Sequence, residues 1–122
     1  MARATEHRSF VNALALVEAF GAAWTEHDLD LALSFLSDDC VFDATGPSPD
    51  GTRHVGPGDI RHAWKAIFDD PSSKFEAEET FGAKDRVVQR WRYSWSGGYV
   101  RGIDVFKVSG DTITEKLSYV KG

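Results

Sequence analysis

Two aspartates in strand-like stretches are the residues of this chain best suited to acid–base chemistry. The first, Asp104, lies in the stretch 99–108, where it shares its parity with Gly102 and Phe106. Because successive side chains of a strand point to opposite faces, we expect Asp104 on an apolar inner face. A carboxylate there must pair with a cation, accept hydrogen bonds or stay protonated with a raised pKa. Asp104 is therefore either an acid of a functional site or half of a structural ion pair with Lys116, and both interpretations stay open.

The second aspartate, Asp43, lies in an expected short strand, residues 40–44, directly before a turn formed by Thr45, Gly46 and Pro47. Side chains at such a position commonly face the mouth of a pocket, and the alternative is an aspartate that caps the turn. His54 follows in a short extended piece. A single histidine without a fixed partner is more often structural or exposed than catalytic.

An aromatic strand face is expected opposite Asp104. In the stretch 86–95, one parity carries Val87, Gln89, Trp91, Tyr93 and Trp95, and we expect this face to meet the helices. A turn at Gly97 and Gly98 would place Trp91 opposite Asp104, whereas a turn at Ser96 and Gly97 would place Gln89 there.

The last strand, residues 112–120, has two possible registers. Its binary pattern favours Ile113, Leu117 and Tyr119 as the buried set. A three-residue loop at 109–111 would instead put Lys116 and Ser118 on the Asp104 face.

The elements that must position these residues form an α+β pattern. Apolar residues at helical spacing predict a helix over about 9–26, Asp28 caps a second short helix, and Pro57 begins a third that ends near Asp69. Alternating residues then predict strands over 75–81, 86–95, 99–108 and 112–120. We expect three N-terminal helices packed on a strongly curved, mostly antiparallel sheet, a cone-like α+β barrel that encloses an apolar pocket. The chain reads as one domain, 1–122, with residues 1–8 as a flexible extension.

Composition excludes several function classes. The net charge of −5 argues against nucleic acid as a partner. No apolar run is long enough for a membrane span or a signal peptide, and the single cysteine, Cys40, suits a reducing compartment, so we expect a cytoplasmic protein. The four histidines lack metal-ligand spacing and there is no phosphate-binding glycine loop, so we expect neither a metal nor another cofactor.

Two segments carry a likeness to a known family. The run from Leu36 to Asp43, after a short helix that follows His27 and Asp28, and the segment 102–108 followed by Gly110-Asp111-Thr112-Ile113, resemble the nuclear transport factor 2-like superfamily. The closest likeness is to its SnoaL-like and ketosteroid isomerase-like branch, over about residues 9–121. This resemblance implies the fold described above, on a scaffold that hosts isomerases, cyclases, dehydratases, hydrolases and non-catalytic modules.

The resemblance also implies roles for single residues. Asp104 matches the ketosteroid isomerase acid that stays protonated and donates to an oxyanion, and Asp43, with a one-residue gap, matches the general base. The oxyanion tyrosine of that family falls at Phe20, which has no hydroxyl group. The Asp-Arg-Asp set of the related limonene epoxide hydrolase falls at Tyr93, Trp91 and Ser118, so epoxide hydrolysis is not expected.

We therefore predict a cofactor-free, isomerase- or cyclase-like enzyme that transfers a proton on a small apolar carbonyl compound. Asp43 is its predicted base and Asp104 its predicted hydrogen-bond donor. The predicted ligand contacts are Phe20, Trp24, His54, Trp64, Gln89, Trp91, Tyr93, Phe106, Lys116 and Ser118.

The alternative function is a non-catalytic module for ligand binding or dimeric interaction. Under either interpretation we expect a homodimer through the outer sheet face, whose mix of arginine, aromatic and aliphatic groups is typical of interfaces. That face carries Arg90, Arg92, Tyr99, Arg101 and Ile103.

Overall fold

The computed structural model describes residues 12–122, and the predicted extension, residues 1–8, lies outside them. In this part of the chain the helices are α1 (Ala13–Thr25), α2 (Leu29–Ser34) and α3 (Pro57–Asp69). The strands are β1 (Leu36–Asp43), β2 (Arg53–Val55), β3 (Lys74–Ala83), β4 (Arg86–Trp95), β5 (Gly98–Ser109) and β6 (Thr112–Val120).

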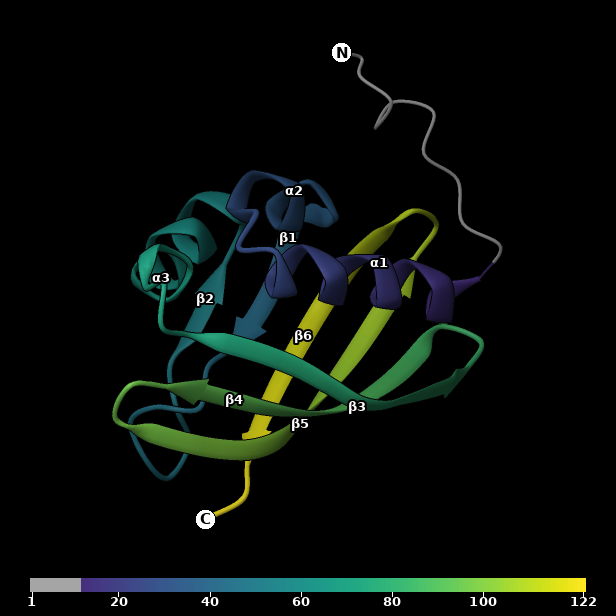
Figure 1. The fold of residues 1–122 in the computed structure, drawn as a ribbon. Coiled ribbons are helices and arrows are strands. Elements are labelled where there is room, and N and C mark those ends of the chain that lie inside the picture. Colours follow the sequence, from purple (N-terminus) through teal and green to yellow (C-terminus); the bar gives the residue numbers. More distant parts are fainter. Residues whose placement is uncertain (1–11) are drawn as a thin grey trace.

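The six strands form one sheet in the order β2-β1-β6-β5-β4-β3, and only the pair of β1 and β6 is parallel. Figure 1 shows the three helices gathered over one face of this sheet. In that view β1 and β6 run steeply while β3 and β4 run across, as expected of a strongly twisted sheet. The sheet stays open, with β2 and β3 as its edges. The predicted α+β class, helices on a curved and mostly antiparallel sheet, is confirmed.

Local signals in the sequence fix the ends of the helices. The side chain of Asn12 accepts a hydrogen bond from the backbone N–H of Ala15 at the start of α1, and that of Asp28 accepts one from Leu31 at the start of α2. Pro57 opens α3, where its missing N–H is not needed. These residues fix where each helix begins, and the buried apolar residues of α1 and α3 decide which face of each of these helices turns inward.

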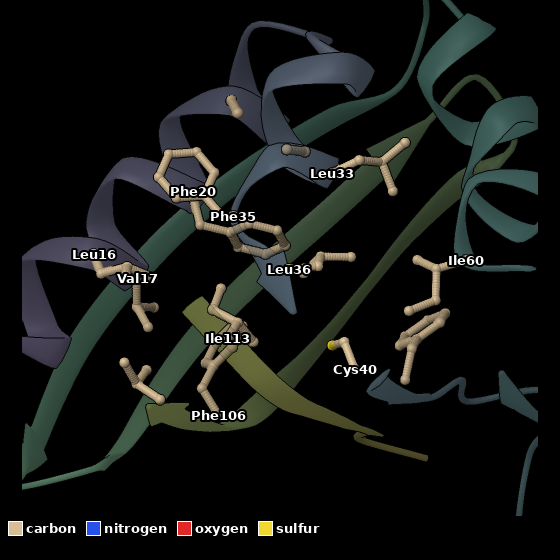
Figure 2. Close-up of a cluster of buried hydrophobic side chains, with 14 of the residues drawn as sticks. Leu16, Val17, Phe20, Leu33, Phe35, Leu36, Cys40, Ile60, Phe106 and Ile113 are labelled. Carbon is tan, nitrogen blue, oxygen red and sulfur yellow. The ribbon is translucent and has the colours of Figure 1, made fainter. Parts of the chain in front are cut away.

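The core lies between the helices and the sheet. Figure 2 shows Leu16, Val17 and Phe20 of α1 above Phe106 and Ile113 of the sheet. All five side chains are essentially inaccessible to solvent. Phe106 belongs to this core and does not line the cavity described below, so its predicted ligand-contact role is not supported.

The turn between β4 and β5 settles the first open register. Trp95 pairs with Gly98, so the turn residues are Ser96 and Gly97, and Gln89 lies opposite Asp104. Of the two turns that the sequence allowed, this is the second.

A β-bulge settles the register of β6. Val108 pairs with Ile113 and Lys107 with Glu115, which leaves Thr114 as an extra residue. The bulge reverses the parity of the strand, so that both Ile113 and Lys116 are buried. The binary pattern was therefore wrong in burying Tyr119, which is 55% exposed, and Leu117, which is only half-buried. The second register, with Lys116 and Ser118 on the Asp104 face, is correct, although the turn has two residues rather than three.

Candidate functional site

A cavity of about 450 Å³ lies between the helices and the inner face of the sheet. Its walls are mainly aromatic, which suits an apolar ligand. All predicted ligand contacts except Phe106 line it, as does Asp104. The lining residues are Phe20, Trp24, Phe42, Ala44, Thr45, Gly46, His54, Ala63, Trp64, Ile67, Phe75, Gln89, Trp91, Tyr93, Val100, Asp104, Lys116, Ser118 and Val120.

The rings of the wall support one another. The Trp24 and Trp64 ring centroids are 5.0 Å apart at 70°, and Phe42 lies edge-on to Trp64 at 5.4 Å. Such packed aromatic pairs hold side chains in place and give the cavity a fixed shape. Phe42 was missed by the sequence analysis, although strand alternation could have found it: a strand that turns Phe42 inward must turn Asp43 outward.

The polar centre of the cavity is formed by Asp104, Lys116 and Ser118. Lys116 Nζ lies 3.1 Å from Asp104 Oδ2, and the Ser118 hydroxyl donates to Asp104 Oδ1 at 2.6 Å. Lys116 Nζ also lies 3.0 Å from Ser118 Oγ. The Asp104 side chain is only 4% exposed and that of Lys116 only 8%. Asp104 is thus held as a hydrogen-bond acceptor beside a cation, rather than as the proton donor that the resemblance implied.

The Lys116 ammonium is surrounded by aromatic faces as well. It lies 4.7 Å from the ring centroid of Phe42, 5.4 Å from that of Trp24 and 5.7 Å from that of Trp64. Cation–π attraction and the Asp104 carboxylate together offset the cost of burying this charge.

Asp43 lies apart from this centre. It accepts two hydrogen bonds from Arg53, at 2.8 Å from Nε and 3.0 Å from Nη2, and it does not line the cavity. The neighbouring residues Phe42 and Ala44 take the cavity face of β1 instead. The hydrogen bonds from Arg53 also hold the pKa of Asp43 below its ordinary value, which weakens it as a base. The predicted role of Asp43 as general base is therefore not supported, and we assign it no proton transfer.

His54 does line the cavity, and it has a partner that the sequence did not reveal. Its ring stacks on Phe42 with the centroids 5.7 Å apart and the planes inclined by 19°. Nδ1 lies 3.4 Å from Asp59 Oδ1, at the first turn of α3. No signal of this contact is present in the sequence, because the contact forms only when α3 folds back against β2.

Gln89 is a further polar residue on the inner face of the sheet. It is 2% exposed, lies opposite Asp104 on β4, and its Nε2 donates to Thr80 Oγ1 at 3.1 Å. The indole N–H groups of Trp24, Trp64 and Trp91 are buried and, within residues 12–122, have no hydrogen-bond partner. The site therefore holds more hydrogen-bond donors than its own acceptors satisfy.

Three further features of residues 12–122 concern metal ligands, membrane-spanning helices and the single cysteine. No group of three or more metal-ligating side chains is found among them. None of their helices is long and apolar enough to cross a membrane. Burial raises the pKa of the Cys40 thiol to about 12, so this cysteine is not an activated nucleophile.

Comparison with known proteins adds a family. The model of the SnoaL-like domain matches residues 17–116. A nuclear transport factor 2-like protein of unknown function from Mesorhizobium loti is 37% identical, with 88% of both chains covered and a TM-score of 0.81. No curated protein matches the sequence significantly.

Two more distant structures share the fold. A "putative ketosteroid isomerase" from Kribbella flavida is 9% identical, with 90% of this chain and 78% of that chain covered and a TM-score of 0.78. A Mycobacterium tuberculosis protein in complex with estradiol-17beta-hemisuccinate is 22% identical, with 88% and 92% covered and a TM-score of 0.73.

Proposed function

Because the chain belongs to the SnoaL-like domain family, we propose that it is a cofactor-free enzyme that moves a proton on a small, largely apolar carbonyl compound. One observation carries the proposal: the buried pair of Lys116 and Asp104, at 3.1 Å, lines an aromatic cavity of about 450 Å³. Charged groups that are buried in the wall of an apolar cavity are candidate catalytic groups.

The spacing of the pair suits the chemistry of a carbonyl group. The carbonyl oxygen and the proton on the adjacent carbon belong to neighbouring atoms, so an acid and a base that are 3.1 Å apart can serve both at once. Asp104 Oδ2 takes the proton, the C–H electron pair moves into the new C=C bond, and the carbonyl electron pair moves to oxygen. Lys116 donates a hydrogen bond to the resulting enolate oxygen. Return of the proton to another position completes an isomerisation.

The other residues of the cavity support this step. The hydroxyl of Ser118 donates to Oδ1 of Asp104, so that Oδ2 remains the oxygen that faces Lys116. The rings of Trp24, Phe42 and Trp64 surround the ammonium and exclude water, which strengthens its interaction with a developing negative charge. The steroid derivative bound by the Mycobacterium tuberculosis protein supports a multi-ring apolar ligand for this fold.

The test uses 2-tetralone, a two-ring ketone, as the probe. The protein is incubated with it in D₂O, and deuterium incorporation beside the carbonyl is followed by NMR against buffer alone. We expect wild-type protein to accelerate exchange, D104N to lower the accelerated rate at least about 100-fold and K116M at least about tenfold. D43N is the matched control and should retain the wild-type rate. Acceleration that survives in D104N would contradict the proposal.

A second candidate function is ligand binding without catalysis. It is favoured by the fact that Asp104 already accepts a hydrogen bond from Ser118 and lies within ion-pair distance of Lys116. Saturable binding of 2-tetralone with no exchange above the buffer rate would select this alternative.

The proposal includes a homodimer through the outer face of the sheet. Tyr99 and Tyr119 are 54% and 55% exposed there, and the Arg92 guanidinium lies 4.0 Å over the Tyr99 ring. Glu78 and Arg101, which form an ion pair at 3.3 Å within the chain, line a hollow beside Tyr119. A twofold contact would place this hollow and the exposed tyrosines against their own copies. Sedimentation should give a dimer for wild-type protein and K65E, and a monomer for Y119E. A wild-type monomer at micromolar concentration would overturn the proposed homodimer.

The cytoplasmic location stays a prediction.

A further inference from the structure

His54 and Lys116 are neighbours of one ring, Phe42. In the sheet, Phe42 pairs with His54 on β2 and with Lys116 on β6, so the three residues form one row across three strands. The centroid of the His54 ring lies 5.7 Å from that of Phe42, and Lys116 Nζ lies 4.7 Å from it. All three line the cavity. The row therefore gives the cavity a polar group on each side of an apolar ring.

The two ring nitrogens of His54 have different surroundings. Nδ1 faces the Asp59 carboxylate at 3.4 Å, whereas Nε2 has no hydrogen-bond partner within residues 12–122. Asp59 is itself fixed, because its Oδ2 accepts a hydrogen bond from the backbone N–H of Val55 at 3.2 Å. The His54 side chain is 20% exposed, so it is neither sealed in the core nor fully solvated.

A carboxylate beside Nδ1 determines what Nε2 can do. Of the two neutral tautomers, it favours the one with the proton on Nδ1, which leaves a lone pair on Nε2. Among the groups packed near the ring, Asp59 of α3 is an anion, Phe42 of β1 is neutral, and the Lys116 cation of β6 is already paired with Asp104. A neutral Nε2 accepts a hydrogen bond, and its complement on a ligand is a hydroxyl group.

We propose that His54 is a specificity-determining residue that accepts a hydrogen bond from a ligand hydroxyl group, on the side of the ligand remote from its carbonyl. This inference rests on the proposed function, which places the carbonyl oxygen at Lys116. The substrate class is then a hydroxylated carbonyl compound with an apolar ring between its two polar groups. Asp59 is a positioning residue, because it acts only through the orientation and tautomer of His54.

The test compares the binding of 6-hydroxy-2-tetralone with that of 2-tetralone, by calorimetry near neutral pH. Wild-type protein should prefer the hydroxylated compound by about three- to tenfold, the range that one net hydrogen bond gives. H54F retains a ring that can stack on Phe42 but has no ring nitrogen, and it should lose the preference. H62F, at an exposed histidine of α3 outside the cavity, is the matched control and should keep it.

A second readout does not depend on ligand binding. NMR correlations of the His54 ring nitrogens should show the proton on Nδ1 in wild-type protein and a loss of this bias in D59N. A proton on Nε2 in wild-type protein, or a hydroxyl preference that survives in H54F, would overturn the inference.

The failure of this inference can be told apart from the failure of the proposed function. Loss of the preference in H54F without any wild-type exchange of 2-tetralone would remove the enzyme proposal and leave the role of His54 standing. Deuterium exchange that depends on Asp104, without a preference for the hydroxylated compound, would support the enzyme proposal and overturn the role of His54. If neither compound binds at millimolar concentration, the role of His54 is also overturned.

Discussion

Lys116 Nζ and Asp104 Oδ2 lie 3.1 Å apart on adjacent strands, and the two side chains are buried almost completely. The pair bears on both the stability of the fold and the proposed proton transfer, because the same contact can serve either purpose. Burying two charges costs free energy that their attraction does not always offset. The cost of burying this pair beside a cavity is consistent with the catalytic role that we propose for it.

Breaking the pair should destabilise the protein strongly. K116M leaves the Asp104 carboxylate buried beside Ser118 without a cation, and we expect a loss of about 3–5 kcal/mol in the free energy of unfolding. The double variant K116M/D104L removes both charges and should recover most of that loss. Urea unfolding measures both values. K65M, which breaks the exposed pair of Lys65 and Asp69 on α3, is the control and should cost less than about 1 kcal/mol. Equal losses in K116M and K65M would contradict a tightly paired, buried Lys116.

The Asp43–Arg53 pair should affect stability only at moderately acidic pH and above. Hydrogen bonds from Arg53 lower the pKa of Asp43 in the folded state, so its contribution is present above the unfolded-state pKa, near 4. It should disappear as the pH falls through the lowered folded value. Unfolding of wild-type protein and D43N, compared from pH 2 to pH 7, should show a small difference at neutral pH that vanishes in acid. A difference that persists at the acid end would show that the carboxylate charge is not responsible.

Cys40 should introduce a stability change at alkaline pH. Burial raises its pKa from 9.0 to about 12, so the folded state holds the proton that the unfolded state releases. The resulting stabilisation is complete below pH 9 and is lost as the pH rises toward 12. Over this range the free energy of unfolding should fall by up to about 1.4 kcal/mol per pH unit. C40A should lack this slope. A native thiol that reacts rapidly with a thiol reagent at pH 8 would contradict the burial of Cys40.

Gly102 should be required for the shape of the cavity. A methyl group added there would lie 2.2 Å from the Tyr119 carbonyl oxygen and 2.7 Å from ring carbons of Trp91. Since Trp91 lines the cavity, G102A should cost about 1–3 kcal/mol of stability and weaken binding of 2-tetralone. Calorimetric melting and binding measure the two effects. A methyl group added at Gly58 on α3 would have no atom of residues 12–122 within 4 Å apart from its own helix backbone and chain neighbours, so G58A should be neutral or slightly stabilising. Equal behaviour of the two variants would contradict the close contact at Gly102.

The inner faces of β4 and β5 were predictable from residue types alone. The parity of β4 and β5 placed Trp91 and Gln89 with Asp104, and the structure agrees, because alternation in a strand is a local property. The caps at Asp28 and Pro57 were equally local and equally correct.

Two features escaped prediction because they depend on more than local pattern. The bulge at Thr114 brings Lys116 inward, and a binary pattern cannot detect one inserted residue without the partner strand. The pairing of His54 with Asp59 depends on how α3 folds back against β2, which is a tertiary contact. Asp43 is a different case: the resemblance aligned it with a base, although the alternation of Phe42 and Asp43 already argued against a place in the cavity.

The most direct test of the central claim is the carbon NMR shift of 2-tetralone labelled at its carbonyl carbon and bound to the protein. A carbonyl oxygen that accepts a hydrogen bond from Lys116 should give a downfield shift relative to the same compound bound to K116M/D104L, with D43N unchanged from wild type. An identical shift in wild-type protein and in the double variant would mean that the carbonyl does not meet the Lys116–Asp104 pair.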